Sequence, residues 1–120
     1  MKIPSKAIKL NDNYPDWYWQ RGLHDAKILS VSEPVCNVLE INLNSSSAIF
    51  EFDIEKITLF NYKIYLDNFC ICDIEKTWWM GDSIYLLPNN KYLLEIETAP
   101  LRGCHLNFMI ECEKAVVKRK

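Results

Sequence analysis

The most chemically varied stretch of the chain runs from Asp16 to Ala26, and it contains a histidine directly before an aspartate. A pair such as His24 and Asp25 could act as a general base or supply ligands to a metal ion. The same stretch contains residue types that dominate the binding energy of protein interfaces, namely Trp17, Trp19 and Arg21. It therefore predicts either acid–base chemistry or a binding surface near the start of the chain.

Other features of the sequence argue against catalysis. Successive residues of a strand point to opposite faces, so His24 and Asp25 need not meet. Nothing in the stretch supplies the nucleophile of covalent catalysis, and the sequence lacks glycine-rich phosphate loops, Gly-x-Ser-x-Gly elbows and His-Glu-x-x-His pairs. We therefore expect no enzyme, a His24 ring bonded to a backbone group, and a turn at Asp25. The remaining catalytic option joins the pair to Glu51, Asp53 or Asp82.

A second group of candidates is the run Trp-Trp-Met-Gly-Asp at residues 78–82. Two successive tryptophans on a strand cannot enter the same core, so we expect one inside and the other exposed or covering an end of the fold. An exposed tryptophan can stack on a sugar or anchor a protein interface. Gly81 and Asp82 are expected in a tight turn. The binding candidates of the two stretches are Trp17, Trp19, Arg21, His24, Asp25, Trp78, Trp79 and Asp82.

Residues 21–28, Arg-Gly-Leu-His-Asp-Ala-Lys-Ile, resemble the opening of several small uncharacterised bacterial domains with a His-Asp-Ala motif at the first strand. Some of those domains are similar to immunity proteins of bacterial polymorphic toxin systems. Residues 23–28 carry the resemblance, within the first third of the chain. Leu23 stands where an aromatic residue is common, and Lys27 where an acidic one is common. The resemblance implies a cytoplasmic, non-enzymatic domain that binds a protein partner, and it assigns no binding residues.

The elements that must position these residues read as strands. After residue 26 the hydrophobic residues recur with a period of two, which predicts about seven or eight short strands. We expect a mainly β fold, an antiparallel barrel or sandwich with at most one or two short helices. The clearest hairpin joins residues 83–87 to residues 92–98. Further strands are expected at 26–32, 38–44, 50–55, 57–66, 69–74 and 106–112, with a break at Glu33-Pro34.

Some segments are less regular. Residues 53–60 fit a strand or a short helix, and their β-branched and aromatic content favours the strand. Residues 16–22 could form a turn or two of helix, with Asp16 as N-cap and Gly22 at the end. Residues 1–15 are expected to be extended, and the basic residues 114–120 to form a tail that frays.

Composition sets the class of protein. The 120 residues, 49% hydrophobic and 25% charged, suit one domain, residues 1–120, with its own core. The net charge of −2 disfavours a nucleic-acid binder. No secretory signal or membrane-spanning run is visible. Five cysteines, an odd number, argue against a disulfide framework, and their spacing argues against zinc. We therefore expect a cytoplasmic protein with reduced thiols, no metal and no cofactor.

Acidic residues occupy alternate positions along the expected strands, at Glu40, Glu51, Asp53, Glu55, Glu95, Glu97, Glu111 and Glu113. An acidic face suits an inhibitor of a basic toxin or nuclease, because complementary fields speed association. The simpler interpretation is a solvated sheet face. Taken with the resemblance of residues 23–28 and the lack of a catalytic motif, the acidic positions lead us to expect a protein-binding, immunity-like domain. The alternative is a small-ligand or carbohydrate binder with a tryptophan-lined pocket. The partner and the oligomeric state stay open, and an edge-strand dimer is one option.

Overall fold

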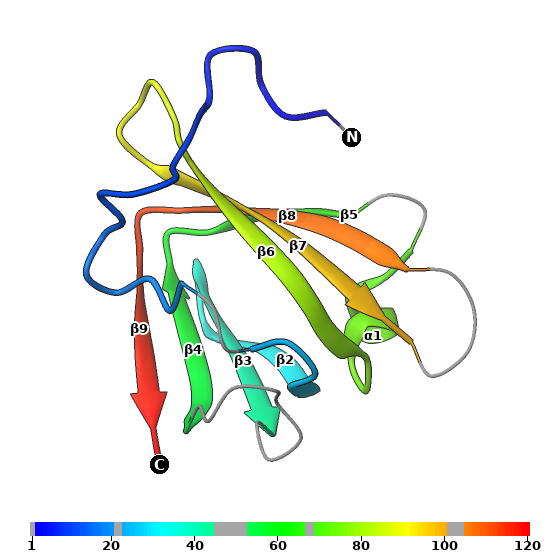
Figure 1. The fold of residues 1–120 in the computed structure, drawn as a ribbon. Helices are drawn as coiled ribbons and strands as arrows, with labels where there is room; N and C mark the ends of the chain where they lie inside the picture. The colour runs from blue at the N-terminus through cyan, green and yellow to red at the C-terminus, as the bar shows by residue number, and fades with distance from the viewer. Residues whose placement is uncertain (1, 21–22, 45–52, 67–68, 101–104) are drawn as a thin grey trace.

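The alternating apolar residues form nine strands and one short helix in the described part of a computed structural model, residues 2–20, 23–44, 53–66, 69–100 and 105–120 (Figure 1). In chain order the elements are β1 (Ile8–Lys9), β2 (Lys27–Val35), β3 (Val38–Asn44), β4 (Ile54–Phe60), β5 (Lys63–Leu66), α1 (Ile71–Ile74), β6 (Trp78–Leu86), β7 (Tyr92–Ala99), β8 (Leu106–Cys112) and β9 (Lys114–Arg119). Residues 53–60 are strand from Ile54 onward, as their composition favours.

The strands of the described residues join one antiparallel sheet in the order β5-β8-β7-β6-β2-β3-β4-β9, with β1 on β6. β2 and β6 meet over a short junction, where Lys27 pairs with Trp78. The sheet thus has two halves, β5-β8-β7-β6 and β2-β3-β4-β9, which pack against each other as in a sandwich (Figure 1). The expected mainly β fold is confirmed, as a sandwich rather than a closed barrel.

Both halves contribute their inward-facing residues to one apolar core. Alternation places every second residue of a strand inside. The buried core includes Trp79, Leu94, Ile96, Phe108 and Ile110 from one half, and Leu39, Ile41, Ile57, Leu59 and Ala115 from the other. The radius of gyration is 13.5 Å, close to the value of about 13.6 Å expected for a folded domain of this length.

The expected basic tail is wrong, because residues 114–119 form β9. This strand pairs with β4 over its whole length, from Ile54 opposite Arg119 to Phe60 opposite Lys114. Ala115 is buried in the core, whereas Val116 is exposed. Buried and exposed residues alternate at the start of this strand, although its lysines made the segment look like a charged tail.

Four further segments differ from expectation. Residues 69–74 hold helix α1 instead of a strand, because the Asp73 carboxylate accepts a hydrogen bond of 2.8 Å from the Cys70 backbone N–H and closes a helical turn. β2 continues through the predicted break at Glu33-Pro34, and the hairpin turns at Cys36-Asn37. The expected strand 57–66 is divided between β4 and β5. Residues 16–17 form a turn and residues 18–20 are irregular, so the expected helix is absent from the described part of 16–22. Gly22 lies outside the described residues.

The N-terminal residues run along β6 and cover part of the outer face of its half. β1 pairs with the end of β6, where Ile8 lies opposite Leu86. Ile3 and Ala7 pack on an apolar cluster separate from the main core, formed by Leu87, Leu93 and Met109. None of the described helical residues forms a helix long and apolar enough to cross a membrane.

Candidate functional site

Gly81 and Asp82 lie within β6, so the turn predicted for them is wrong. The register of β6 on β7 shifts between Trp79 and Gly81, a bulge that the glycine accompanies. Beyond the bulge the Asp82 carboxylate accepts hydrogen bonds from the Tyr18 hydroxyl, from Trp19 Nε1 at 2.9 Å and from Trp79 Nε1 at 2.9 Å. These contacts fasten the aromatic N-terminal segment to the centre of β6.

The environment of this carboxylate is that of a structural anchor. Burial raises the pKa of Asp82, while the hydrogen bonds from Trp19, Tyr18 and Trp79 act to lower it. Burial also raises the pKa of Tyr18, and the neighbouring Asp82 carboxylate adds to that shift. Because all its described partners are donors locked in the core, Asp82 is placed to hold the fold together.

Trp79 of the second tryptophan pair packs against the first pair, Trp17 and Trp19, whereas Trp78 does not. The rings of Trp19 and Trp79 meet edge to face with centroids 5.7 Å apart, and the two residues are 4% and 0% exposed. Trp17 is half-buried, edge to face with Tyr92 at 5.3 Å. Because Trp19 and Trp79 are closed into the core, the described residues do not form the expected pocket lined by four tryptophans.

The His-Asp-Ala motif forms a turn that positions β2 on β6. Asp25 has a φ of 70°, a left-handed conformation that aspartate tolerates better than most residues. Its backbone N–H donates to the Trp79 carbonyl at 2.7 Å, and the Ala26 N–H donates to the Leu23 carbonyl at 2.8 Å. Leu23 and Ala26 are buried on either side. The backbone of the motif thus fixes the start of β2 against β6.

His24 and Asp25 do meet, contrary to the expectation based on strand geometry, because they lie in a turn. His24 Nδ1 is 3.2 Å from Asp25 Oδ2. The nitrogen is shielded from solvent, yet it is not aligned for a hydrogen bond with that carboxylate or with any other described group. The expected bond from the ring to a backbone group is therefore not made at Nδ1. Both side chains are a little over one-third exposed, at 38% and 39%.

Trp78 points away from the buried Trp79, as the alternation of a strand requires. It is half-buried, with the Lys27 ammonium 5.5 Å from its ring centroid. Together with Asp25, Met80 and Ala99 it lines a hollow of about 380 Å³. The sequence candidates thus divide into a buried anchor and an exposed turn, while Arg21 lies outside the described residues.

The outer face of β6, β7 and β8 carries an acidic surface. We call Glu95, Glu97 and Glu111 the acidic face; they alternate with core residues along β7 and β8. Glu95 accepts from the Tyr85 hydroxyl at 3.2 Å, and Glu97 lies 2.6 Å from Nδ1 of the exposed His105. Within the described ranges, no lysine or arginine forms an ion pair with these three carboxylates.

A hollow of about 380 Å³ opens on the acidic face, with Gly81, Ser83, Glu95, Glu97 and Asn107 in its wall. A Cβ atom on Gly81 would have no neighbour within 4 Å, so the missing side chain leaves real space. The sequence placed the glutamates on outward positions, and the structure agrees. It did not indicate Ser83, Asn107 or the hollow, although an isolated glycine within a strand pattern was an available signal.

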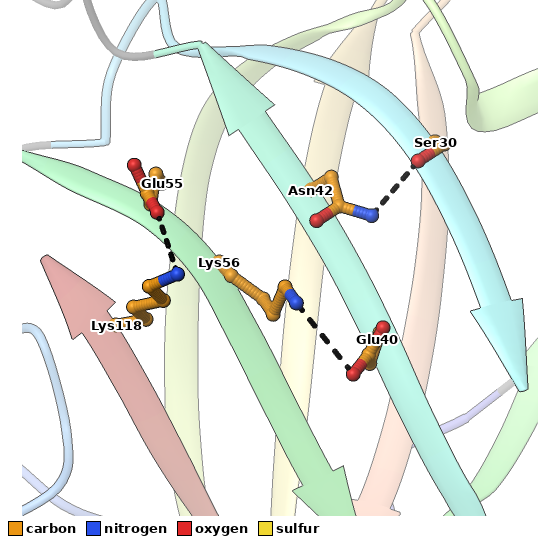
Figure 2. Close-up of polar contacts among 6 residues, drawn as sticks. All are labelled: Ser30, Glu40, Asn42, Glu55, Lys56 and Lys118. Carbon is orange, nitrogen blue, oxygen red and sulfur yellow. Dashed lines mark hydrogen bonds and ion pairs between the residues drawn. The ribbon is translucent and has the colours of Figure 1, made fainter. Parts of the chain in front are cut away.

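The opposite outer surface has a different charge arrangement. On β2, β3, β4 and β9, whose outer side we call the paired face, the three polar contacts drawn in Figure 2 each join neighbouring strands. Lys56 Nζ lies 3.7 Å from Glu40, and Lys118 Nζ lies 3.1 Å from Glu55. Asn42 Nδ2 donates to Ser30 at 2.9 Å. Glu40 and Glu55 of this half thus each have a lysine neighbour, whereas Glu33 of β2 accepts a hydrogen bond from the Tyr62 hydroxyl. Glu51 lies outside the described residues.

At the end of the paired face, Arg119 lies 2.8 Å from Asp53. The hydrogen bond from Arg119 lowers the pKa of this exposed carboxyl group. Among the residues that the structure describes, no three His, Cys, Asp or Glu side chains come together as ligands for a metal ion. Comparison of the chain with protein-family models, with curated proteins and with solved structures finds no match.

Proposed function

We propose that this protein is a non-enzymatic binding domain that takes a basic protein partner on its acidic face. Residues 23–28 resemble the opening of small bacterial domains, and some of those domains are similar to immunity proteins. The observation that carries the proposal is the contrast between Glu95, Glu97 and Glu111, which have tyrosine, asparagine or histidine partners, and the lysine-paired carboxylates of the other half. Glu95 and Glu111 have no cationic neighbour among the described residues, and such carboxylates keep a field that attracts a positive surface.

The hollow beside Gly81 supports an arginine or lysine side chain of the partner as the central contact. Carboxylates of Glu95 and Glu97 flank it, and Ser83 and Asn107 add neutral polar groups. A guanidinium group forms short, directional hydrogen bonds with carboxylates, and arginine is enriched among the residues that dominate interfaces. Such a contact gives specificity in addition to electrostatic attraction.

The geometry of the His-Asp-Ala turn supports a structural role for Asp25, and so supports binding over catalysis by the His24–Asp25 pair. The turn is fixed by backbone hydrogen bonds to β6, and Asp25 occupies a conformation in which a short polar residue is favoured. The cytoplasm suits the proposal, because Cys36, Cys70 and Cys72 are exposed free thiols.

The test is co-expression with the product of the neighbouring reading frame. If that product arrests growth, this protein should restore growth and form a complex whose affinity falls steeply with added salt. A neighbouring product without toxicity, or an arrest that this protein does not relieve, would contradict the immunity-like role.

A matched pair of double variants locates the surface. Glu95→Gln with Glu97→Gln and Glu40→Gln with Glu55→Gln change the net charge equally, on opposite faces. We expect the first pair to weaken the complex by about tenfold or more, and the second to leave it within about twofold of wild type. Equal losses from both pairs would show that net charge, rather than the acidic face, governs binding.

A further inference from the structure

An apolar pocket lies between the N-terminal segment and the outer face of β7 and β8. Its volume is about 370 Å³, within the range of small-molecule sites. Leu87, Leu93 and Met109, the buried residues of the apolar cluster outside the main core, line it. The other lining residues are Lys2, Pro4, Tyr65, Pro88, Asn89 and Glu111.

This pocket exists because apolar residues occupy the outer side of the sheet near the turn that joins β6 to β7. Leu93 and Met109 face outward, on the side of β7 and β8 opposite the core residues Leu94 and Ile110. The N-terminal segment covers this cluster in part, through Ile3 and Ala7. What stays uncovered is a concave surface with apolar walls.

The polar group that distinguishes this pocket is the carboxylate of Glu111. Its Oε2 accepts from the Tyr65 hydroxyl at 3.3 Å, and its Oε1 accepts from Asn89 Nδ2 at 3.1 Å. Both donors are neutral, and each carboxylate oxygen can accept a further hydrogen bond. Lys2 lines the same pocket, but its ammonium is not within ion-pair distance of Glu111 in the described structure.

We propose that this pocket binds a small primary amine with an apolar body, whose ammonium group donates to Glu111 while its hydrocarbon part packs on Leu93 and Met109. A carboxylate that accepts from two neutral donors and lines an otherwise largely apolar cavity matches a molecule with one cationic end. A charge-assisted hydrogen bond of this kind is about twice as strong as a neutral one. Burial of the hydrocarbon adds affinity in proportion to its area.

The proposal is tested with three probes of equal chain length, namely hexylamine, hexanol and hexanoate, titrated against the full chain by calorimetry. Hexylamine should bind saturably and about tenfold more tightly than hexanol, and hexanoate more weakly than either. The variant Glu111→Gln should bring hexylamine to the affinity of hexanol, leaving the alcohol unchanged. Lys2→Ala, which removes a competing ammonium, should leave hexylamine binding equal or tighter.

A second readout places the probe. The methyl resonance of Met109 should shift on titration with hexylamine. The methyl resonance of Met80, which lines the separate hollow beside Trp78, should not shift. Absence of saturable binding by any probe, equal binding of amine and alcohol, or a Glu111→Gln variant with unchanged preference would overturn the proposal. The Glu95→Gln, Glu97→Gln double variant should bind hexylamine like wild type, so this pocket and the partner surface can fail separately.

Discussion

The two outer faces of the sandwich cover the same core, but their carboxylates have different partners. On the paired face, Glu40 and Glu55 have lysine partners on neighbouring strands (Figure 2). On the acidic face, Glu95 and Glu111 have hydroxyl or amide partners. Cross-strand pairs of opposite charge stabilise a sheet, so the paired face serves the fold. Glu95 and Glu111 have no such cationic partner among the described residues, and this difference is the basis of the proposed function.

Both faces lie over one shared core, and the largest expected effect comes from opening a cavity in that core. Trp79→Ala deletes a fully buried ring and a hydrogen bond to Asp82. We expect the free energy of unfolding to fall by about 3–5 kcal/mol in urea denaturation, because the ring leaves a cavity.

The neighbouring residue supplies the control for that variant. Trp78→Ala removes a half-buried ring and its contact with the Lys27 ammonium, and should cost only about 1 kcal/mol. If the two substitutions destabilised the protein equally, the assignment of inward and outward sides to β6 would be wrong, and the division of the molecule into two faces would fail with it.

The next effect concerns the Asp82 anchor. Asp82→Ala leaves the Tyr18 hydroxyl and two indole N–H groups without their acceptor, and should cost about 1–3 kcal/mol. Asp82→Asn removes the charge but keeps an acceptor. The pKa of Asp82 is raised above its usual value of 3.8, so its contribution to stability is full below 3.8 and is lost as pH rises through the folded-state pKa.

The advantage of wild type over Asp82→Asn should therefore shrink as the pH increases from below 3.8. The measurement is the free energy of unfolding of both proteins at a series of pH values. A wild-type advantage that grows with pH would mean that the three donors outweigh burial, and that the anchor holds a stabilised carboxylate.

A smaller effect tests the hollow of the acidic face. Gly81→Ala should raise the free energy of unfolding by about 0.5–1 kcal/mol, because alanine loses less backbone entropy on folding and its Cβ meets nothing within 4 Å. Gly81→Leu should fill the hollow and weaken the partner complex by about tenfold without destabilising the fold. Destabilisation by alanine would show that the hollow is too tight to admit a side chain.

Local alternation was enough to predict most of the fold. The hairpin of β6 and β7 follows from period-two apolar residues around Pro88-Asn89-Asn90-Lys91, and the outward positions of Glu95 and Glu97 follow from the same period. The opposite orientations of Trp78 and Trp79 also follow from strand geometry. Each of these features depends on residues close together in sequence.

Two of the missed features depend on distant residues. Asp82 looked like a turn residue beside Gly81, because its partners Tyr18 and Trp19 lie more than sixty positions earlier. Residues 114–119 looked like a charged tail, because their pairing with β4 is likewise remote in sequence. Helix α1 was missed for a local reason, the capping of Cys70 by Asp73, which outweighed the apolar pattern.

The smallest effect separates the two faces most directly. Glu40→Gln with Glu55→Gln removes two partly exposed ion pairs and should lower the free energy of unfolding by about 0.5–1 kcal/mol at low salt. Glu95→Gln with Glu97→Gln removes two like charges on one side of β7, and should leave stability unchanged or slightly higher. In 1 M salt, where the Debye length is about 3 Å, both differences should vanish. Because the two variants carry the same net charge, changes in stability of opposite sign at low salt can arise only from the local pairing of the carboxylates. Variants of equal stability would mean that the carboxylates of the two faces do not differ in their pairing.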